Sequence, residues 1–363
     1  MDSYDKLDSV WQEEDKFLEL MITDGCFMLE IMRTKIEANP TPNHAENEPI
    51  FSTHWLRYIR PYIRRDMLLL ENQLPMLVLY HLVAKDKNKE ANECINETNN
   101  LILGFYGMHT KEMGERLHVM DVFRKGLLLP DPQKDQPEMN NCVRTILKFC
   151  FLEKCITGMK RCLWHVVDVS RKIRLKETEN DEENEKIIRS ATELKKTGIQ
   201  FKKSPTHSLE DISFAGGVLK LPVIMVDGTT ESKFLNLITF ERLHGTGNEI
   251  TSYIGFMDSI INNEHDVALL HTKGIIQNAM GSDKAVAKLF NALCQEVPVE
   301  FNRSICEVQE DISEYYRDPS NSSWAKFHDT YCSSPWARLS LFAAVFLFTL
   351  TIIQTVYAML SYY

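Results

Sequence analysis

Four polar residues beside a leucine-rich stretch have the side chains most able to do chemistry in this chain. Asp66, Glu71, Asn72 and Gln73 lie in the segment DMLLLENQLPMLVL, where apolar runs flank them. Carboxylates and amides that are drawn into apolar surroundings must find hydrogen-bond partners, or each costs a few kcal/mol. We therefore predict a buried polar network that fixes how two helices meet.

A catalytic use of the same carboxylates is the alternative interpretation. In a membrane-bound enzyme, Asp66 and Glu71 would surround a cleft together with His81 and His118. Such a site requires a polar pocket that joins at least two of these four side chains.

The other candidate motifs are incomplete. The segment His244-Gly245-Thr246-Gly247 lacks the strand and helix of a dinucleotide-binding unit, so we interpret it as an ordinary loop. Cys162 and His165 lie three residues apart with Cys155 nearby, but tetrahedral zinc needs four donors. There is no Walker loop, HExxH or GxSxG motif. We therefore expect no catalytic, cofactor-binding or metal-binding residues and no enzymatic activity.

The elements that would position these residues are mainly helical. Apolar residues recur at helical spacing from Trp11 to Met32, and we predict that two helical stretches meet at Asp24-Gly25. A new helix should start near Pro75, because proline is favoured in the first helical turn. A long helix is predicted from Cys142 to Ile173. The expected fold is a large multi-helix domain with a small β-hairpin, followed by one transmembrane helix.

The hairpin is predicted where the apolar periodicity changes. Residues in the segment Asp211–Asp227 alternate on both sides of Gly216-Gly217, which is a hairpin signal. Pro222 should confine the second strand to a sheet edge, because proline cannot donate a ladder hydrogen bond. Side chains that can cap helices then predict three further helix starts, at Thr251 or Ser252, at Asn263 and at Ser282.

Size and charge limit the domain organisation and the partners. Residues 1–335 are long enough for one helical domain, and the acid-rich stretch 176–190 is the expected hinge if this domain has two lobes. The chain has 41 basic and 51 acidic residues and a formal charge of −10. This balance disfavours nucleic-acid binding.

The carboxyl-terminal tail has the composition of a membrane span. Residues 339–360 carry no charge, and a helix of about 22 residues reaches about 33 Å, enough to cross a hydrocarbon core of about 30 Å. Trp336 and Arg338 flank the run on its amino-terminal side, where an aromatic ring and a basic residue are typical of the headgroup region. We expect a single-pass protein of the plasma membrane or an endomembrane, with the bilayer as a partner of this helix.

The side of the membrane follows from charge and cysteine usage. Arg338 precedes the span, and the first residues lack the basic and apolar regions of a secretory signal, so we expect the large domain in the cytosol. Nine cysteines without a CxxC pair fit a reducing compartment. Three glycosylation sequons would matter only if the domain faced a lumen. They begin at Asn96, Asn302 and Asn321.

A series of segments agrees in order with a known family pattern. The chain resembles the plant family known as domain of unknown function 247 from about Phe17 to its end. The matching segments are Asp24-Gly25-Cys26-Phe27 with Glu30, Asp66–Pro75, Ala191–Phe201, Asp211–Pro222, Asn236–Glu241, Ser252–Leu270, Lys273-Gly274-Ile275-Ile276, Pro335-Trp336-Ala337 and Gln354-Thr355. Family members usually begin with a further segment that carries a valine-proline motif, so we expect an amino-terminally shortened member.

The resemblance implies a plant-specific, largely helical protein with a carboxyl-terminal membrane anchor and no established enzymatic activity. Some grass relatives are similar in role to male determinants of self-incompatibility, which recognise small secreted proteins of the stigma. That role suits an outward-facing domain and conflicts with the cytosolic expectation. We therefore expect a non-catalytic recognition or signalling module with protein partners; neither the partners nor an oligomeric state is predicted.

Overall fold

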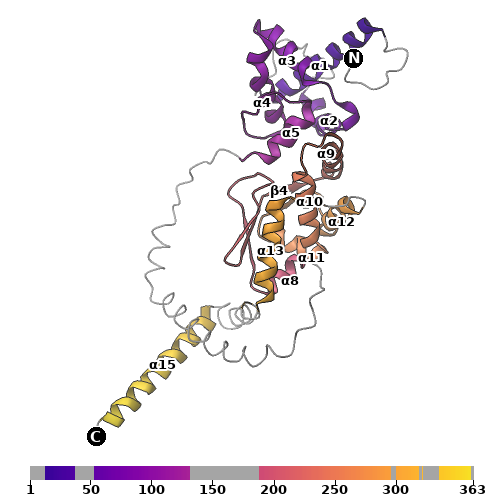
Figure 1. Cartoon of the computed structure of the whole chain (residues 1–363). Coiled ribbons are helices and arrows are strands. Elements are labelled where there is room, and N and C mark those ends of the chain that lie inside the picture. Colours follow the sequence, from indigo (N-terminus) through magenta and orange to yellow (C-terminus); the bar gives the residue numbers. More distant parts are fainter. Residues whose placement is uncertain are drawn as a thin grey trace. The chain divides into compact units, whose positions relative to one another are not determined.

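The computed structural model describes residues 13–36, 53–130, 188–295, 300–318, 321 and 335–360. Within them the chain is mainly α-helical, as predicted, and it contains two small sheets where one hairpin was predicted (Figure 1). The predicted long helix from Cys142 to Ile173 and nearly all of the predicted hinge at 176–190 lie outside the described residues. Contacts divide the chain into two compact units. One comprises Met1–Gln133, Phe201–Ser213 and Leu219–Val308, and the other comprises Lys134–Gln200, Phe214–Val218 and Gln309–Tyr363.

The first described part of the chain is entirely helical. Its elements are α1 (Glu14–Ile36), α2 (Thr53–Asp66), η2 (Leu70–Asn72), α3 (Met76–Lys87), η3 (Ala91–Cys94), α4 (Ile95–Tyr106) and α5 (Val119–Leu128). Helix α1 packs on α3 and α4, and α4 packs on α5. Large apolar side chains such as Met32, Leu79 and Phe105 are fully buried among them. Helices α1, α3, α4 and α5 form one core because each packs an apolar face against its neighbours.

The predicted turn at Asp24-Gly25 is wrong, because α1 continues through these residues as one helix. A Cβ atom on Gly25 would lie 2.6 Å from Leu82 Cδ1 of α3. The glycine therefore serves close packing of α1 against α3 and does not break the helix. By contrast, the predicted start near Pro75 is confirmed. Helix α3 begins at Met76, with Pro75 as its N-cap residue.

The later helices confirm two of the three predicted starts. These helices are α8 (Ala191–Lys196), α9 (Thr230–His244), α10 (Glu249–Ile260), α11 (Glu264–Thr272), α12 (Asp283–Cys294), α13 (Arg303–Arg317) and α15 (Pro335–Leu360). Asn263 and Ser282 cap α11 and α12 with their side chains. Asp266 completes a capping box with Asn263. Helix α10 starts at Glu249, upstream of the predicted Thr251 or Ser252, because its cap comes from another helix, as described below.

Five short strands form the two sheets. They are β1 (Gln200–Lys203), β2 (Ser213–Ala215), β3 (Val218–Leu221), β4 (Ile224–Val226) and β5 (Ile276–Asn278). The predicted hairpin is confirmed: β2 and β3 are neighbours in the sheet of order β1-β3-β2, and Gly216 and Gly217 join them at φ 56° and 78°. Only glycine adopts such angles without cost.

The predicted edge position of the strand at Pro222 is wrong. Strand β3 lies in the middle of its sheet and ends at Leu221, the residue before the proline. Pro222 cannot donate a ladder hydrogen bond, so the strand stops there and the chain enters a second sheet. In that sheet β4 pairs in parallel with β5, with Met225 opposite Gln277.

The predicted membrane span lies within α15, a helix of 26 residues that carries the carboxyl terminus (Figure 1). Among the described residues, no single helix is both long and apolar enough to cross a membrane, and the apolar part of α15 covers Phe346–Ala358. A pair of helical segments bent by 93°, Tyr58–Asp66 and Leu70–Lys87, meets the same length and composition criteria together. Trp336 and Arg338 lie in the first turn of α15, and their side chains are outside the described residues.

Candidate functional site

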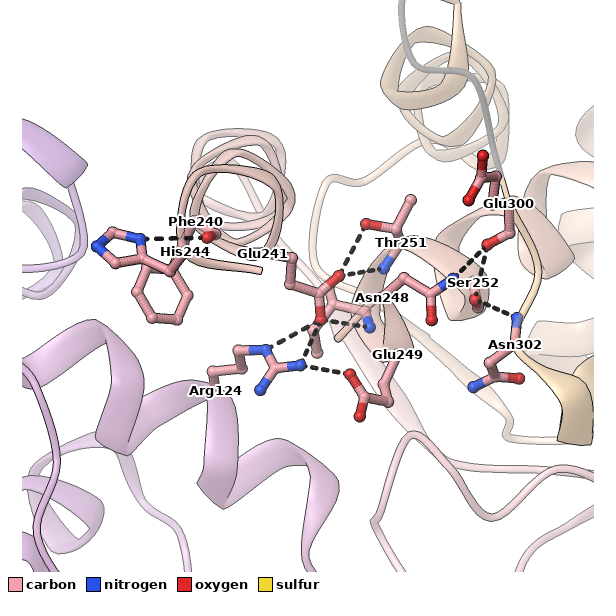
Figure 2. A network of polar contacts seen from close by, with 11 residues as sticks. Arg124, Phe240, Glu241, His244, Asn248, Glu249, Thr251, Ser252, Glu300 and Asn302 are labelled. Atoms are coloured by element: carbon pink, nitrogen blue, oxygen red, sulfur yellow. Dashed lines mark hydrogen bonds and ion pairs between the residues drawn. The ribbon is translucent and has the colours of Figure 1, made fainter. Parts of the chain in front are cut away.

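The most connected polar group in the described residues is a buried arginine with two carboxylates. Arg124 on α5 is buried, with 6% of its side chain exposed. Its guanidinium donates to Glu241 Oε1 of α9 through Nε at 2.9 Å, and its Nη2 forms an ion pair with the same oxygen at 2.8 Å. Nη2 also pairs with Glu249 Oε2 at the start of α10 (Figure 2). The three side chains therefore connect α5, α9 and α10.

Glu241 is also the cap of helix α10. Its Oε1 accepts from the Ile250 backbone N–H at 3.0 Å, and its Oε2 accepts from Thr251 N–H at 3.0 Å and from Thr251 Oγ1 at 2.8 Å (Figure 2). The first backbone N–H groups of a helix have no partner within the helix. The N-cap residue Asn248 makes no capping bond with its side chain. A carboxylate from α9 therefore satisfies donors that a local side chain usually satisfies, and its negative charge lies at the positive end of α10.

The Glu241 carboxylate has no capacity left for a substrate. A carboxylate offers about four lone-pair sites, and Glu241 already receives hydrogen bonds from Arg124, Ile250 and Thr251. With 1% of its side chain exposed, it is also closed to solvent. The arrangement therefore suits a structural connection between helices and not a general base.

A second layer of hydrogen bonds fixes the segment before α13 to α10. Asn248 Nδ2 and Ser252 Oγ both donate to the Glu300 carbonyl oxygen, at 2.8 Å and 3.1 Å. The Asn302 backbone N–H donates to Ser252 Oγ at 2.8 Å (Figure 2). Ser252, a predicted helix start, thus lies inside α10 and bridges two segments of the chain.

Two histidines lie next to the network. His118 is the N-cap of α5, where Nδ1 accepts from the Asp121 N–H at 3.4 Å. Its ring lies 4.9 Å from the Phe240 ring and 5.8 Å from the His244 ring, centroid to centroid. The pKa of His118 is lowered to about 4, mainly by burial; Asp121 opposes the shift and His244 adds a smaller lowering. His118 is therefore neutral at pH 7 and serves to cap and pack.

The predicted polar network near η2 is only partly inside the protein. Glu71 and Asn72 are exposed, and Asp66 and Gln73 are half-buried. Asn72 Nδ2 donates to the Asp66 carbonyl at 3.2 Å. Gln73 Nε2 donates to the Met67 and Leu69 carbonyls at 2.9 Å and 2.7 Å. Gln73 Oε1 accepts from the Met120 N–H at 3.1 Å. Gln73 is thus the member that connects the η2 turn to α5.

The structure does not bring the four residues of the enzyme alternative together. Within the described part of the chain, no hydrogen bond or ion pair joins any two of Asp66, Glu71, His81 and His118, and His81 is exposed. Nowhere in the described part of the chain do three or more His, Cys, Asp or Glu side chains lie close enough together to hold a metal ion. Cys155, Cys162 and His165 lie outside the described residues.

The glycine segment that follows α9 is a loop, as predicted. Gly245 ends α9 in the left-handed conformation at φ 59°, and α10 begins at Glu249. The chain here joins two helices, without the strand that a dinucleotide-binding turn requires.

Sequence reasoning missed the central residues of the network. Glu241 follows Phe234, Leu237 and Ile238 at helical spacing, so it belongs to the apolar face of α9. Arg124 lies between buried apolar residues of α5 in the same way. A charged residue on an apolar helix face needs a partner of opposite charge. A charged residue at such a position in the sequence could therefore have indicated a buried ion pair. It does not indicate which residues form that pair.

Comparison with known proteins gives one family. The model of a family described as "Plant protein of unknown function", number 247, matches residues 1–350. The UPF0481 protein At3g47200 of Arabidopsis thaliana is 30% identical over 381 aligned positions, which cover 100% of this chain and 73% of that protein. The Putative UPF0481 protein At3g02645 of the same plant is 28% identical over 173 positions, 47% of this chain and 33% of that protein.

No solved structure matches the chain. The family model covers nearly all of the sequence, and every segment that carries the resemblance lies within it except Gln354-Thr355. The chain therefore belongs to the plant protein family of unknown function number 247.

Proposed function

We propose that this protein is a membrane-tethered recognition module that acts through protein partners and catalyses no reaction itself. The main support for membrane attachment is the exposed apolar surface of helix α15. Its described apolar side chains are exposed: Phe346, Leu347 and Phe348 are consecutive, so they point in different directions around the helix, and they are 56%, 62% and 68% exposed. A helix that is apolar on all sides belongs in a protein core or in lipid.

The uncharged run 339–360 within α15 supports lipid as the environment. The run 339–360 has no charged residue, and Thr351 and Thr355 direct their hydroxyls to the carbonyls of Leu347 and Thr351 within the helix. Such bonds pair these two hydroxyls within the helix, as a hydrocarbon environment requires. Tyr357 near the end of the run is 75% exposed, where an aromatic ring could lie at the headgroup level.

The cytosolic side is proposed for the large domain. Arg338 precedes the run, and basic residues flank spans on the cytosolic side. Cys26, Cys94, Cys294 and Cys306, in the described residues, are free thiols, which suit a reducing compartment.

A non-catalytic role is proposed because the most connected polar group has no free capacity. Glu241 is closed to solvent, and its carboxylate oxygens are already paired with Arg124 and with the backbone N–H groups of α10. The four residues of the enzyme alternative do not converge, so no observation favours that function.

Alkaline carbonate extraction of membranes, with epitope tags at both ends of the full chain, tests the tether. We expect the wild type to stay in the membrane pellet and the variant Phe346→Glu with Leu350→Glu to move to the supernatant. Leu243→Glu is the matched control, because Leu243 is 67% exposed on α9 and should leave the distribution unchanged. A wild-type protein that carbonate releases would refute the tether. Protease protection of the amino-terminal tag on intact membranes would refute the cytosolic side.

Proximity labelling with chemical crosslinking tests the recognition role. A fusion of the labelling enzyme to the amino terminus should mark the same partner proteins in replicate plant samples, and a fusion that bears only α15 should not. Absence of any reproducible partner in crosslinked samples contradicts the proposal.

A further inference from the structure

The parallel strand pair β4–β5 has one packed face and one open face. In its register Ile224 lies opposite Ile276 and Met225 lies opposite Gln277. Ile224 and Ile276 are buried, with 7% and 0% exposure. Met225 is 60% exposed, and Gln277 is exposed as well. Neighbouring residues of a strand point to opposite faces, so the exposed pair forms an apolar and polar surface away from the core.

A cavity of about 470 Å³ includes this exposed pair. Its other lining residues are Lys203, His271, Gly274 and, on either side of Gln277, Ile276, Asn278 and Ala279. All of them belong to one compact unit of the chain. The ammonium of Lys203 lies over Gly274, 2.8 Å from where a Cβ atom on that glycine would stand. The absence of a side chain at Gly274 therefore leaves room for the lysine in the cavity wall.

The cavity is basic, although the chain is acidic. Its lining contains Lys203 and His271 and no carboxylate, whereas the whole chain has 51 acidic and 41 basic residues. Within the part of the chain that the structure describes, Lys203 forms no ion pair. His271 Nδ1 lies 3.7 Å from Asp283 Oδ1, and this oxygen already accepts from Asn278 Nδ2 at 2.8 Å. The positive charge of Lys203 thus has no compensating group at the cavity.

We propose that this cavity binds an extended peptide segment of a protein partner, with an acidic side chain at Lys203 and an apolar side chain on Met225. The inference rests on the proposed recognition function and names the chemistry of the partner. Charge complementarity favours the acidic residue. The flexible thioether of an exposed methionine adapts to different apolar side chains. An extended segment presents alternate side chains to a strand surface, which matches the apolar position at Met225 and the basic position at Lys203.

A peptide suits this cavity better than a small molecule. Sites for small ligands bury most of the ligand among apolar walls with a few converging polar groups. Here Met225 remains 60% exposed, and an exposed ion pair contributes only about 0.2–1 kcal/mol by itself. Useful affinity therefore requires contacts along a segment.

Selection from phage-displayed random dodecapeptides against the full chain in detergent micelles tests the proposal. We expect selected sequences to share an Asp or Glu within a few residues of an apolar residue. For a synthetic copy of the strongest peptide, fluorescence anisotropy should give a Kd that Lys203→Glu weakens about five- to tenfold and that Met225→Asp also weakens. Lys202→Glu is the matched control, since Lys202 is exposed on β1 beside Lys203 but does not line the cavity.

Several results would overturn the proposal. They are a library without binders, binders without an acidic preference, equal weakening by Lys202→Glu, and competition by polyphosphate as effective as by the peptide itself. Circular dichroism spectra of the variants should match the wild type, because all the changed side chains are exposed.

Partner labelling in plant cells distinguishes an error in this binding site from an error in the proposed recognition function. If wild-type chain and Lys203→Glu label the same partners in plant cells, the recognition function stands and this cavity is not its site. If neither labels a reproducible partner, the recognition function is contradicted, while peptide selection still decides whether the cavity binds acidic segments.

Discussion

Replacing Glu241 with glutamine should release three helices from the carboxylate that connects them. Glutamine has nearly the same shape, so the change removes charge and one acceptor without creating a cavity. Its amide NH₂ would have to face either the Arg124 guanidinium with Ile250 N–H or the Thr251 donors. In the better orientation the oxygen stays with Arg124, and the Thr251 backbone N–H loses its acceptor.

The expected loss of unfolding free energy is about 3–5 kcal/mol. Removing one partner of a buried ion pair costs about that much, because the other charge stays buried. An unsatisfied buried N–H contributes about 1–3 kcal/mol within this range. Glu249 still pairs with Arg124 and limits the loss. A native domain is stable by only about 5–15 kcal/mol, so the variant should unfold at much lower urea concentration.

Two measurements check this prediction. Urea unfolding followed by circular dichroism gives the stability change, and hydrogen exchange with mass spectrometry of the segment around Ile250 and Thr251 reports the cap directly. These amides belong to the first helical turn, where protection requires an acceptor from outside the helix. Glu249→Gln is the control; its side chain is 29% exposed and contacts the same arginine, so we expect a loss of about 1 kcal/mol.

The reasoning is refuted if both variants lose the same small amount and the exchange of the two amides does not change. A further check replaces both buried partners. The double variant Arg124→Met with Glu241→Met should be more stable than Glu241→Met alone, because it leaves no unpaired charge in the interior.

Three further predictions concern other regions. Gly217→Ala should cost about 1–3 kcal/mol more than Gly216→Ala in urea unfolding, because both have positive φ but only a Cβ on Gly217 meets Tyr315, at 2.7 Å from its hydroxyl oxygen; equal losses would contradict this contact. The His118 pKa of about 4 lies below the unfolded value of 6.5, so stability should fall by about 1–2 kcal/mol as the pH decreases from 6.5 to 4. His118→Asn should remove that part of the pH dependence, and an unchanged slope would oppose it. Asn96 is an exposed sequon, so native protein should show no gel shift after glycosidase treatment if the domain is cytosolic.

Features set by neighbouring residues could be predicted from the sequence. The Asn263 and Ser282 caps bind backbone N–H groups two or three residues away, so the side-chain types alone identify them. Pro75 starts a helix for a similarly local reason. Gly216 and Gly217 specify a hairpin because few other residues tolerate their backbone angles.

Features that depend on distant partners could not be predicted. Glu241 and Arg124 are 117 residues apart, and nothing near either residue names the other. Gly25 illustrates the same limit, because glycine within a helical pattern fits both a turn and a close helix contact, and only the position of Leu82 decides between them. Glu71 and Asn72 were expected inside because leucines flank them, but the η2 turn directs both to the surface.

The buried network and the basic cavity differ in whether their charges have partners, and this difference supports their separate roles. Glu241 is fully paired, so it can hold helices but cannot bind anything else. Lys203 is exposed beside an open strand face, so a partner can compensate its charge at little desolvation cost. The two are linked by packing: α10 packs on α12, and Asp283 at the start of α12 holds Asn278 beside the cavity. A rigid support of this kind lowers the entropy lost when a flexible segment binds.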